Sequence, residues 1–313
     1  MYFQKLACLI LFAVAGSLQG EEYFMFSPEK IATHLASCDE KDREAVAKDL
    51  VVVSSVCQVK EAATKDSPFY LASAGGPGSR KSTILERVIQ QNPAYQTGVY
   101  LDPDQRALKF MVHTYHAQSL NALKAASTPN YLDVQKAAYE KWRGASNYIT
   151  LTLLEEVLQK KADIIHGTTL TGAHVEEFLQ KLKYAGYQIK LVLCYCEDDL
   201  RKEAIDYRNI EQRFYQSTSD DAIAKGKLFV EKLPLYFKYA DTLYLYWSDD
   251  LLAEETRAAI FDKGEMTVEE GCFCALENFR DKFERDRSAL QAEGKTIPSW
   301  EELTQCYLSR FQR

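Results

Sequence analysis

A glycine-rich segment has the residue types and spacing of a phosphate-binding site. Residues 70–83 read Tyr-Leu-Ala-Ser-Ala-Gly-Gly-Pro-Gly-Ser-Arg-Lys-Ser-Thr: an apolar run, a loop and the start of a helix. Backbone N–H groups in such a loop and at a helix N-terminus bind anions, and the pattern G-x-x-x-x-G-K-[ST] is typical of a phosphate-binding loop. Gly75, Lys81 and Ser82 match this pattern, whereas Arg80 stands where the second glycine belongs.

The loop predicts ATP and Mg²⁺ as cofactors. Lys81 would lie against the β- and γ-phosphates, and the Ser82 hydroxyl would be a Mg²⁺ ligand. A non-glycine residue at positive φ costs about 1 kcal/mol or more, so Arg80 either distorts the loop or adds a phosphate contact of its own. The complete set of predicted ATP-binding residues is Gly75, Gly76, Pro77, Gly78, Ser79, Arg80, Lys81, Ser82 and Thr83.

Two other polar turns follow apolar segments. Residues 98–101 lead into Asp102-Pro-Asp104, and residues 162–165 lead into His166-Gly-Thr-Thr. Ligand sites in parallel sheets lie at the carboxyl ends of the strands, so these turns are expected to meet the glycine-rich loop. An alcohol that attacks a phosphoryl group needs an acceptor for its proton, which a carboxylate here would supply.

The elements that must position these residues alternate between strand and helix from residue 68 to about 250. Apolar runs predict five strands, and helical periodicity predicts the segments between them. This order predicts an α/β fold of the P-loop NTPase or nucleotide-kinase type, with a five-stranded parallel sheet and helices on both faces. The predicted strands are 69–74, 98–101, 162–165, 187–196 and 242–247.

The ends of the chain predict additional segments. Residues 1–20 have one lysine, a short apolar run and then small and polar residues, which is typical of a signal peptide and predicts secretion or a periplasmic location, or a cytoplasmic one if the leader is not cleaved. Residues 21–67 predict a helical N-terminal segment with Ser27 as its first N-cap, and 251–313 a charged helical C-terminal extension. The short apolar run predicts no stable membrane span.

Charge and cysteine content narrow the functional classes. The net charge of −7 without a basic cluster disfavours nucleic acid as a partner. Eight cysteines, or seven if the leader is removed, are a poor disulfide framework because an odd number would remain and the spacing is irregular. The two C-x-C pairs, 194/196 and 272/274, lack the spacing of structural zinc sites.

The order of these motifs resembles the zeta toxin family over residues 68–250. The resemblance rests on the loop at 74–83, the D-x-D turn at 102–104, the x-G-T turn at 166–168 and a helix carrying Arg208 and Arg213. Zeta toxins are P-loop kinases that transfer the γ-phosphoryl group of ATP to the 3′-hydroxyl of the amino sugar in UDP-N-acetylglucosamine. The resemblance therefore implies a kinase acting on a small molecule such as a sugar nucleotide. It also implies an antitoxin for cytoplasmic members, which this sequence does not identify.

The resemblance implies roles for individual residues. Asp104 matches the family's general base, and Arg213, with Arg208 as the alternative, matches the arginine that reaches over the phosphates. Asp102, His166 and Thr168 are expected on the substrate side. His166 stands where the family has glutamate, and a neutral imidazole cannot supply that negative charge.

Two hypotheses therefore remain open. The chain is an active ATP-dependent kinase, or it is a catalytically degenerate zeta-like protein with a secreted binding or effector role. Arg80, His166 and the segment Ser217–Asp220 are the departures that favour the second reading. A secreted hydrolase is disfavoured because the sequence has no G-x-S-x-G or H-E-x-x-H motif.

Overall fold

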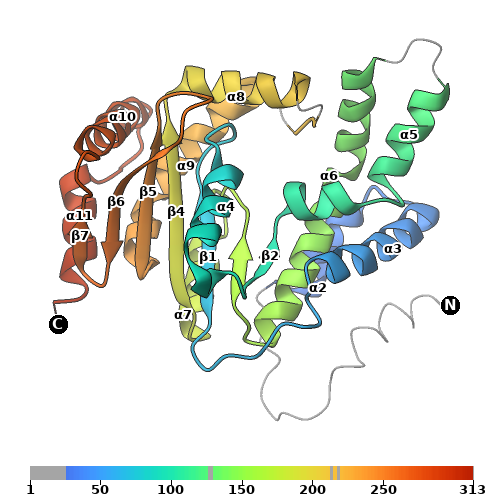
Figure 1. Ribbon diagram of the computed structural model, residues 1–313, viewed down its shortest axis with the longest axis horizontal. Helices are drawn as coiled ribbons and strands as arrows, with labels where there is room; N and C mark the ends of the chain where they lie inside the picture. The colour runs from blue at the N-terminus through green and yellow to red at the C-terminus, as the bar shows by residue number, and fades with distance from the viewer. Residues whose placement is uncertain (1–25, 126–129, 212–213, 217–218, 313) are drawn as a thin grey trace.

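A seven-stranded sheet forms the centre of the computed structural model, which describes residues 26–125, 130–211, 214–216 and 219–312. The strand order is β2-β3-β1-β4-β5-β6-β7 (Figure 1). The strands are β1 (Phe69–Ala74), β2 (Val99–Leu101), β3 (Ile164–His166), β4 (Gln188–Cys196), β5 (Thr242–Ser248), β6 (Thr256–Asp262) and β7 (Glu265–Thr267). The first five are parallel, which confirms the predicted α/β fold and its five parallel strands.

Two antiparallel strands, β6 and β7, extend the sheet where the sequence had predicted only helix. The prediction of a wholly helical extension at 251–313 was wrong for this part. β6 pairs with β5 over residues 256–262, and a two-residue turn at Lys263 and Gly264 leads into β7. Both turn residues have positive φ, 46° and 84°, as a tight hairpin requires. The many charged residues around this Lys-Gly turn led to the prediction of a helix instead of a hairpin.

Helices cover both faces of the sheet, as predicted. On one face α4 buries Ile84, Leu85 and Val88. The other face packs against residues of α6, α7, α9, α10 and α11. The helices and helical turns are α2 (Pro28–Ala32), η1 (Thr33–Leu35), α3 (Glu40–Val56), α4 (Lys81–Gln91), η2 (Pro93–Tyr95), η3 (Pro103–Ala107), η4 (Leu108–Phe110), α5 (Tyr115–Ala125), α6 (Tyr131–Gln159), α7 (Val175–Tyr184), α8 (Asp198–Ile210), α9 (Ser219–Tyr239), α10 (Phe273–Ala292) and α11 (Trp300–Ser309).

The terminal segments lie at opposite edges of the sheet. Figure 1 shows α2 and α3 beside α6 near β2, and α10 and α11 beyond β5 and β6. Ser27 caps α2 by accepting a hydrogen bond from Lys30 N at 3.3 Å, as the sequence predicted. At the other end of the chain, Ser299 begins α11 with a capping box, in which Ser299 Oγ accepts from Glu302 N and Ser299 N donates to Glu302 Oε2.

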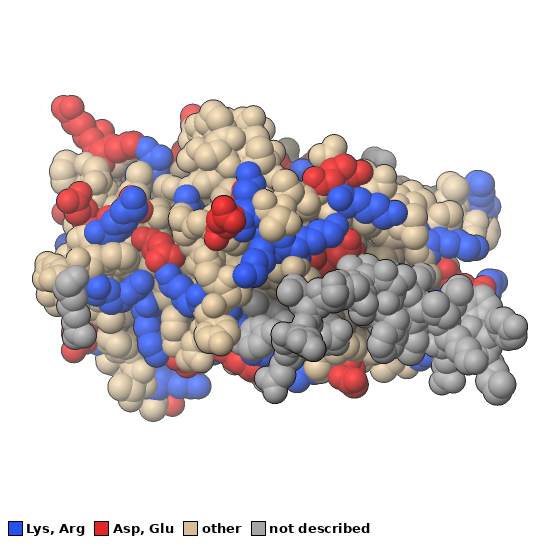
Figure 2. Space-filling model, turned by 90° about the horizontal axis from the view of Figure 1, so that it is seen from below, with Lys and Arg blue, Asp and Glu red and all other residues tan. Residues whose placement is uncertain are grey.

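The remaining expectations concern membranes, metals and charge. The predicted signal peptide at 1–20 lies outside the described residues, and no described helix is long and apolar enough to cross a membrane. Cys194 and Cys196 are buried as free thiols, and the described residues contain no group of three or more metal-ligating side chains. Lys/Arg and Asp/Glu side chains are interspersed over the face shown in Figure 2.

Candidate functional site

The three polar turns meet at one edge of the sheet. Ala72 of β1 and Leu101 of β2 are both in register with His166 of β3, so the carboxyl ends of these strands lie side by side. A cavity of about 1160 Å³ opens at this edge and is lined by residues of all three turns. The convergence that the sequence predicted is therefore present.

The glycine-rich loop folds back onto its own lysine. Lys81 is the first residue of α4, and its Nζ donates to the carbonyl oxygen of Gly76 at 2.8 Å. Ser79 Oγ donates to the same carbonyl, also at 2.8 Å. Ser82 and Thr83 line the cavity beside Lys81. The loop thus holds the Lys81 ammonium group beside the space where phosphate groups are expected to bind.

Burial tunes the charge of Lys81. Desolvation lowers the pKa of its ammonium group to about 8, and the charges of Arg201 and Arg208 act in the same direction. The group remains mostly protonated at pH 7. An anion bound here would replace lost hydration and favour the charged form, because an opposite charge within a few ångströms raises a lysine pKa.

Arg80 adopts the backbone conformation that the missing glycine would supply. Its φ and ψ are 58° and 20°, in the left-handed region, so the loop keeps its turn despite the side chain. The guanidinium is directed to the segment after β5, where Nη1 donates to the carbonyl oxygens of Asp250 and Ala253 at 3.0 and 2.6 Å. Nε forms an ion pair with Glu255 at 2.8 Å. Of the two readings of Arg80, loop distortion is not observed.

Arg201 of α8 braces the other side of the loop and was missed by the sequence analysis. Its side chain is buried, and Nε donates to the carbonyl oxygen of Pro77 at 3.0 Å. Gly78 has φ +81° and lies so close to α8 that a Cβ there would be 2.3 Å from the Arg201 carbonyl oxygen. Nothing in the sequence distinguishes Arg201 from the surface arginines of a helix, because its role arises from the packing of α8 on the loop.

The two aspartates of the D-x-D turn have different surroundings. Asp102 Oδ1 accepts hydrogen bonds from the backbone N–H groups of Asp104 and Gln105, both at 2.7 Å. Burial and the nearby Asp104 charge raise the pKa of Asp102 to about 6. Asp104 is more exposed, lines the cavity and forms an ion pair with Arg143 of α6 at 3.3 Å. Asp102 therefore shapes the turn, and Asp104 presents its carboxylate to the cavity.

Gly167 is required by this arrangement. A Cβ at position 167 would lie 1.9 Å from Asp102 Oδ2. The Gly167 N–H also donates to the carbonyl oxygen of Leu101 at 2.8 Å, which joins the turns after β2 and β3. The glycine of the x-G-T turn thus makes room for the buried carboxylate.

His166 is held as a neutral, hydrogen-bonded side chain. Its Nδ1 is 2.7 Å from the hydroxyl of buried Tyr70, and burial lowers the pKa of the imidazole to about 4. His166 also lines the cavity, as does Thr168, which is joined to the loop strand because Ser73 Oγ donates to the Thr168 carbonyl oxygen at 2.9 Å. The substrate-side roles of these residues, and of Asp102, remain predictions.

Only one of the two predicted arginines lies in the part of the chain that the structure describes. Arg208 lies on α8 and lines the cavity, and burial lowers the pKa of its guanidinium. Arg213 lies outside the described residues. Arg208, the alternative in the sequence analysis, is therefore the arginine that can be located beside the phosphate loop.

The far end of the cavity is formed by the N-terminal segment and α6, which the sequence analysis did not connect to the site. Phe26, Lys30, Ile31 and His34 line it together with a stripe on α6. Phe26 is fixed by stacking on Phe178, with 5.4 Å between ring centroids, and by donating its N–H to Glu155. The α6 stripe is Tyr139, Arg143, Asn147, Thr150 and Leu151.

The spacing of the α6 residues is the sequence feature that could have predicted their place at the cavity. Tyr139, Arg143 and Asn147 recur every four residues, which places them on one helix face. His34 lies against this face, since its carbonyl oxygen is 2.7 Å from the position of a Cβ at Gly144. Burial and the Arg143 charge lower the pKa of the His34 imidazole.

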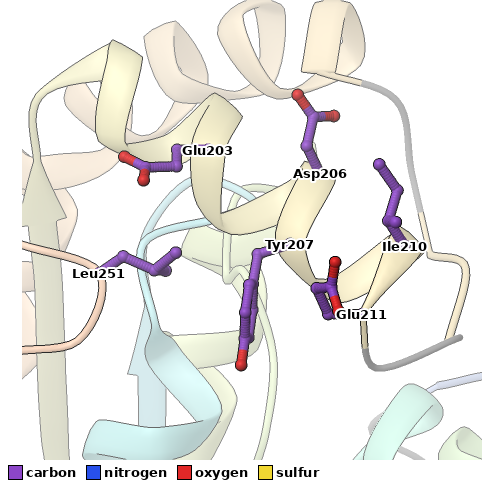
Figure 3. Close-up of a pocket in the computed structure, with 6 residues that line it drawn as sticks. All are labelled: Glu203, Asp206, Tyr207, Ile210, Glu211 and Leu251. Atoms are coloured by element: carbon purple, nitrogen blue, oxygen red, sulfur yellow. The ribbon is translucent and has the colours of Figure 1, made fainter.

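A smaller pocket of about 470 Å³ adjoins the cavity. Figure 3 shows Tyr207 and Asp206 on opposite sides of α8, and Leu251 approaching from the segment after β5. Tyr207 and Leu251 also line the large cavity, so the two spaces are neighbours. Three carboxylates, Glu203, Asp206 and Glu211, surround the smaller one.

The charge of the large cavity is opposite to that of the whole chain. The cationic residues in its lining are Lys30, Arg80, Lys81, Arg143, Arg208, Lys225 and Lys232, and the anionic ones are Asp102, Asp104 and Glu231. The chain as a whole has a net charge of −7. An excess of cations at one concave site in an acidic protein favours an anionic ligand. The described residues thus combine a phosphate loop, a carboxylate and a cationic cavity.

Comparison with known sequences identifies the same segment. The zeta toxin family model matches residues 54–228, more than half of the chain. The match includes the phosphate loop, both polar turns, α6, α8 and the first ten residues of α9. It excludes Phe26–His34 and the segment 249–255. No curated protein matches the chain.

Solved structures share the fold at low sequence identity. The AvrRxo1-ORF1:AvrRxo1-ORF2 complex with sulphate ions aligns with a TM-score of 0.52 and 14% identity, covering 94% of this chain and 96% of that one. The AvrRxo1-ORF1:-ORF2 structure with ATP gives a TM-score of 0.50 and 13% identity over the same shares. A chain of the PezAT toxin–antitoxin system of Streptococcus pneumoniae gives 0.45 and 17%, covering 81% and 97%.

Proposed function

This chain belongs to the zeta toxin family, and from that premise we propose that it is an ATP-dependent kinase. The proposed reaction transfers the γ-phosphoryl group of ATP to a hydroxyl group of a small molecule. One observation carries the proposal: the phosphate loop keeps its turn at Arg80 and presents Lys81 to the same cavity that Asp104 enters. The AvrRxo1 structure with ATP supports nucleotide binding by this fold.

The phosphate end of the site would bind and orient the nucleotide. Backbone N–H groups of the loop and of the α4 N-terminus would donate to phosphate oxygens, and Lys81 would exchange its bond to the Gly76 carbonyl for a phosphate. Arg208 would add a planar cation from α8. Ser82 lines the cavity directly after Lys81, so its hydroxyl fits a Mg²⁺ ligand. Bound Mg²⁺ would neutralise charge on the transferring group.

The carboxylate end would handle the acceptor. Asp104 would accept the proton of the attacking hydroxyl, and its ion pair with Arg143 would hold the carboxylate in place. Asp102 would keep the turn in shape through its two backbone hydrogen bonds. The neutral His166 would offer hydrogen bonding where the family has a negative charge. This difference in charge predicts an acceptor preference that departs from the family's own.

ATP turnover with a panel of acceptors tests the proposal. The panel contains UDP-N-acetylglucosamine, other UDP-sugars and nucleotides, and each is assayed with the unmodified protein and with Lys81→Ala. We expect phosphorylation of at least one compound by the unmodified protein and loss of that activity in the variant. Equal turnover by both proteins would refute the proposal.

A second candidate function is supported by His166. Its Nδ1 is engaged with Tyr70 and its imidazole is neutral at pH 7, so the family's carboxylate has no substitute at this position. A catalytically degenerate protein, secreted through the proposed leader at 1–20, would then use the cavity for binding alone. MgATP binding without phosphorylation of any acceptor would favour this alternative.

A further inference from the structure

Arg80 connects the phosphate loop to a part of the chain outside the family match. The partners of its guanidinium are the carbonyl oxygens of Asp250 and Ala253 and the carboxylate of Glu255, and all three lie between β5 and β6. The family match ends at residue 228. The contact therefore joins the most typical motif of the chain to a segment that the family pattern does not contain.

The segment after β5 is itself held in a fixed shape. Asp250 Oδ1 accepts hydrogen bonds from the backbone N–H groups of Leu252 and Ala253, at 2.7 and 3.1 Å. This turn aims the carbonyl oxygens of Asp250 and Ala253 at the Arg80 guanidinium. The Arg80 guanidinium, held by two carbonyl oxygens of this turn and by the Glu255 carboxylate, has little freedom to reach a bound phosphate.

Glu255 is the centre of the contact. Its side chain is fully buried and lies between Arg80, the residue before α4, and Arg87 of α4, with Arg80 Nε at 2.8 Å and Arg87 Nη2 at 2.5 Å. A buried carboxylate needs such partners because its charge has lost its hydration. Only Arg80 belongs to the phosphate loop. Arg87 lies two turns further along α4, so the two arginines provide a natural comparison.

We propose that Arg80 and Glu255 are positioning residues of the ATP site, through which the segment after β5 holds the phosphate loop in the turn that glycine adopts unaided. The inference rests on the proposed function for its ATP readout. Arg80 is then neither a phosphate ligand nor a defect of the loop. Arg80 then takes the place of the glycine, its conformation is held by contacts from outside the loop, and the segment between β5 and β6 is part of the nucleotide site.

The test compares Glu255→Gln with Arg87→Gln, which removes the partner of Glu255 that is not in the loop. MgATP affinity is measured by titration calorimetry, and amide hydrogen exchange is measured over residues 75–82. We expect Glu255→Gln to weaken MgATP binding by about tenfold and to speed exchange in the loop. Arg87→Gln should lower the melting temperature while leaving MgATP affinity within about twofold.

A rescue variant distinguishes a role in positioning the phosphate loop from a general loss of protein stability. Glycine needs no anchor at positive φ, so Arg80→Gly combined with Glu255→Gln should bind MgATP as well as Arg80→Gly alone. Equal losses in Glu255→Gln and Arg87→Gln would overturn the inference, as would Arg80→Gly weakening MgATP far more than Glu255→Gln does. If the unmodified protein binds no MgATP, the proposed function fails, and unchanged loop exchange in Glu255→Gln still decides against the positioning role.

Discussion

The two ends of the cavity are built in different ways. The phosphate end is one continuous segment, residues 75–83, that turns from β1 into α4. The acceptor end is assembled from η3, α6, α7 and the N-terminal residues 26–34. Backbone groups of a single loop bind phosphate whatever the substrate, whereas side chains from separate elements can vary independently. The phosphate end therefore shows the family relationship, and the acceptor end is where substrate specificity can differ between family members.

The largest effect is expected from Asp104→Asn, at the junction of the two ends. An amide cannot accept the proton of the acceptor hydroxyl, so kcat should fall by about 10²–10⁴-fold. MgATP affinity should stay unchanged, because the contacts of the phosphate loop are intact. The check is a steady-state assay with whichever acceptor the panel identifies, alongside an ATP titration.

Asp102→Asn is the matched control for that variant. Its side-chain oxygen can still accept from the N–H groups of Asp104 and Gln105, so the turn should persist and kcat should change far less. A loss in Asp102→Asn as large as in Asp104→Asn would mean that the carboxylates act as a unit, which contradicts the separate roles.

Lys81→Ala breaks the phosphate end alone. Removing one preorganised charge from the transferring group should lower kcat by about 10²–10³-fold and weaken MgATP binding as well. Lys48→Ala, at an exposed position on α3, is the control and should behave as the unmodified protein. If the Lys81→Ala variant keeps its MgATP affinity, Lys81 does not contribute to nucleotide binding and this prediction is wrong.

The pH dependence of stability tests the neutral state of His166. Its pKa is about 4 in the folded chain and about 6.5 unfolded, so only the unfolded chain takes up a proton between these values. The free energy of unfolding therefore falls as pH drops through this window, by at most about 3 kcal/mol. Asp102, with a folded pKa raised to about 6, opposes this loss, because its folded form gains a proton as pH falls.

His166→Gln isolates the histidine contribution. Glutamine can still accept from the Tyr70 hydroxyl but does not titrate. The difference in unfolding free energy between the two proteins, from urea titrations between pH 7.5 and 4.5, should shift in favour of the variant as pH falls. A difference that is constant over this range would show that His166 is not held neutral.

The sequence predicted the phosphate end closely because its signals are local. The strand Phe69–Ala74 has the predicted bounds, a helix begins directly after the loop as the motif requires, and the positive φ at position 80 follows from the pattern. The direction of the Arg80 side chain could not be predicted. It depends on Glu255, 175 residues later, in a segment between β5 and β6 that the sequence had predicted as helix.

The acceptor end was harder to predict from the sequence, because its residues come together through contacts between distant parts of the chain. Asp104 was predicted from its motif, but its partner Arg143 comes from a long helix whose cavity-facing stripe has no motif. The N-terminal segment was predicted as helical, and Ser27 caps it as expected, yet its place over the cavity follows from packing on α6 and α7. Long-range packing of this kind leaves no local pattern in one sequence.

The smallest effect is expected from His34→Ala, which probes the acceptor end in the N-terminal segment, outside the family match. His34 lines the cavity beside Arg143, and among the described residues its ring has no hydrogen-bond partner, so the ring is available to an acceptor. Loss of one neutral hydrogen bond should raise the acceptor KM about fivefold while kcat and MgATP affinity stay unchanged. His113→Ala, at an exposed position, is the control. If MgATP affinity falls together with acceptor affinity, the phosphate end and the acceptor end are not independent. The division of the cavity into these two ends is then wrong.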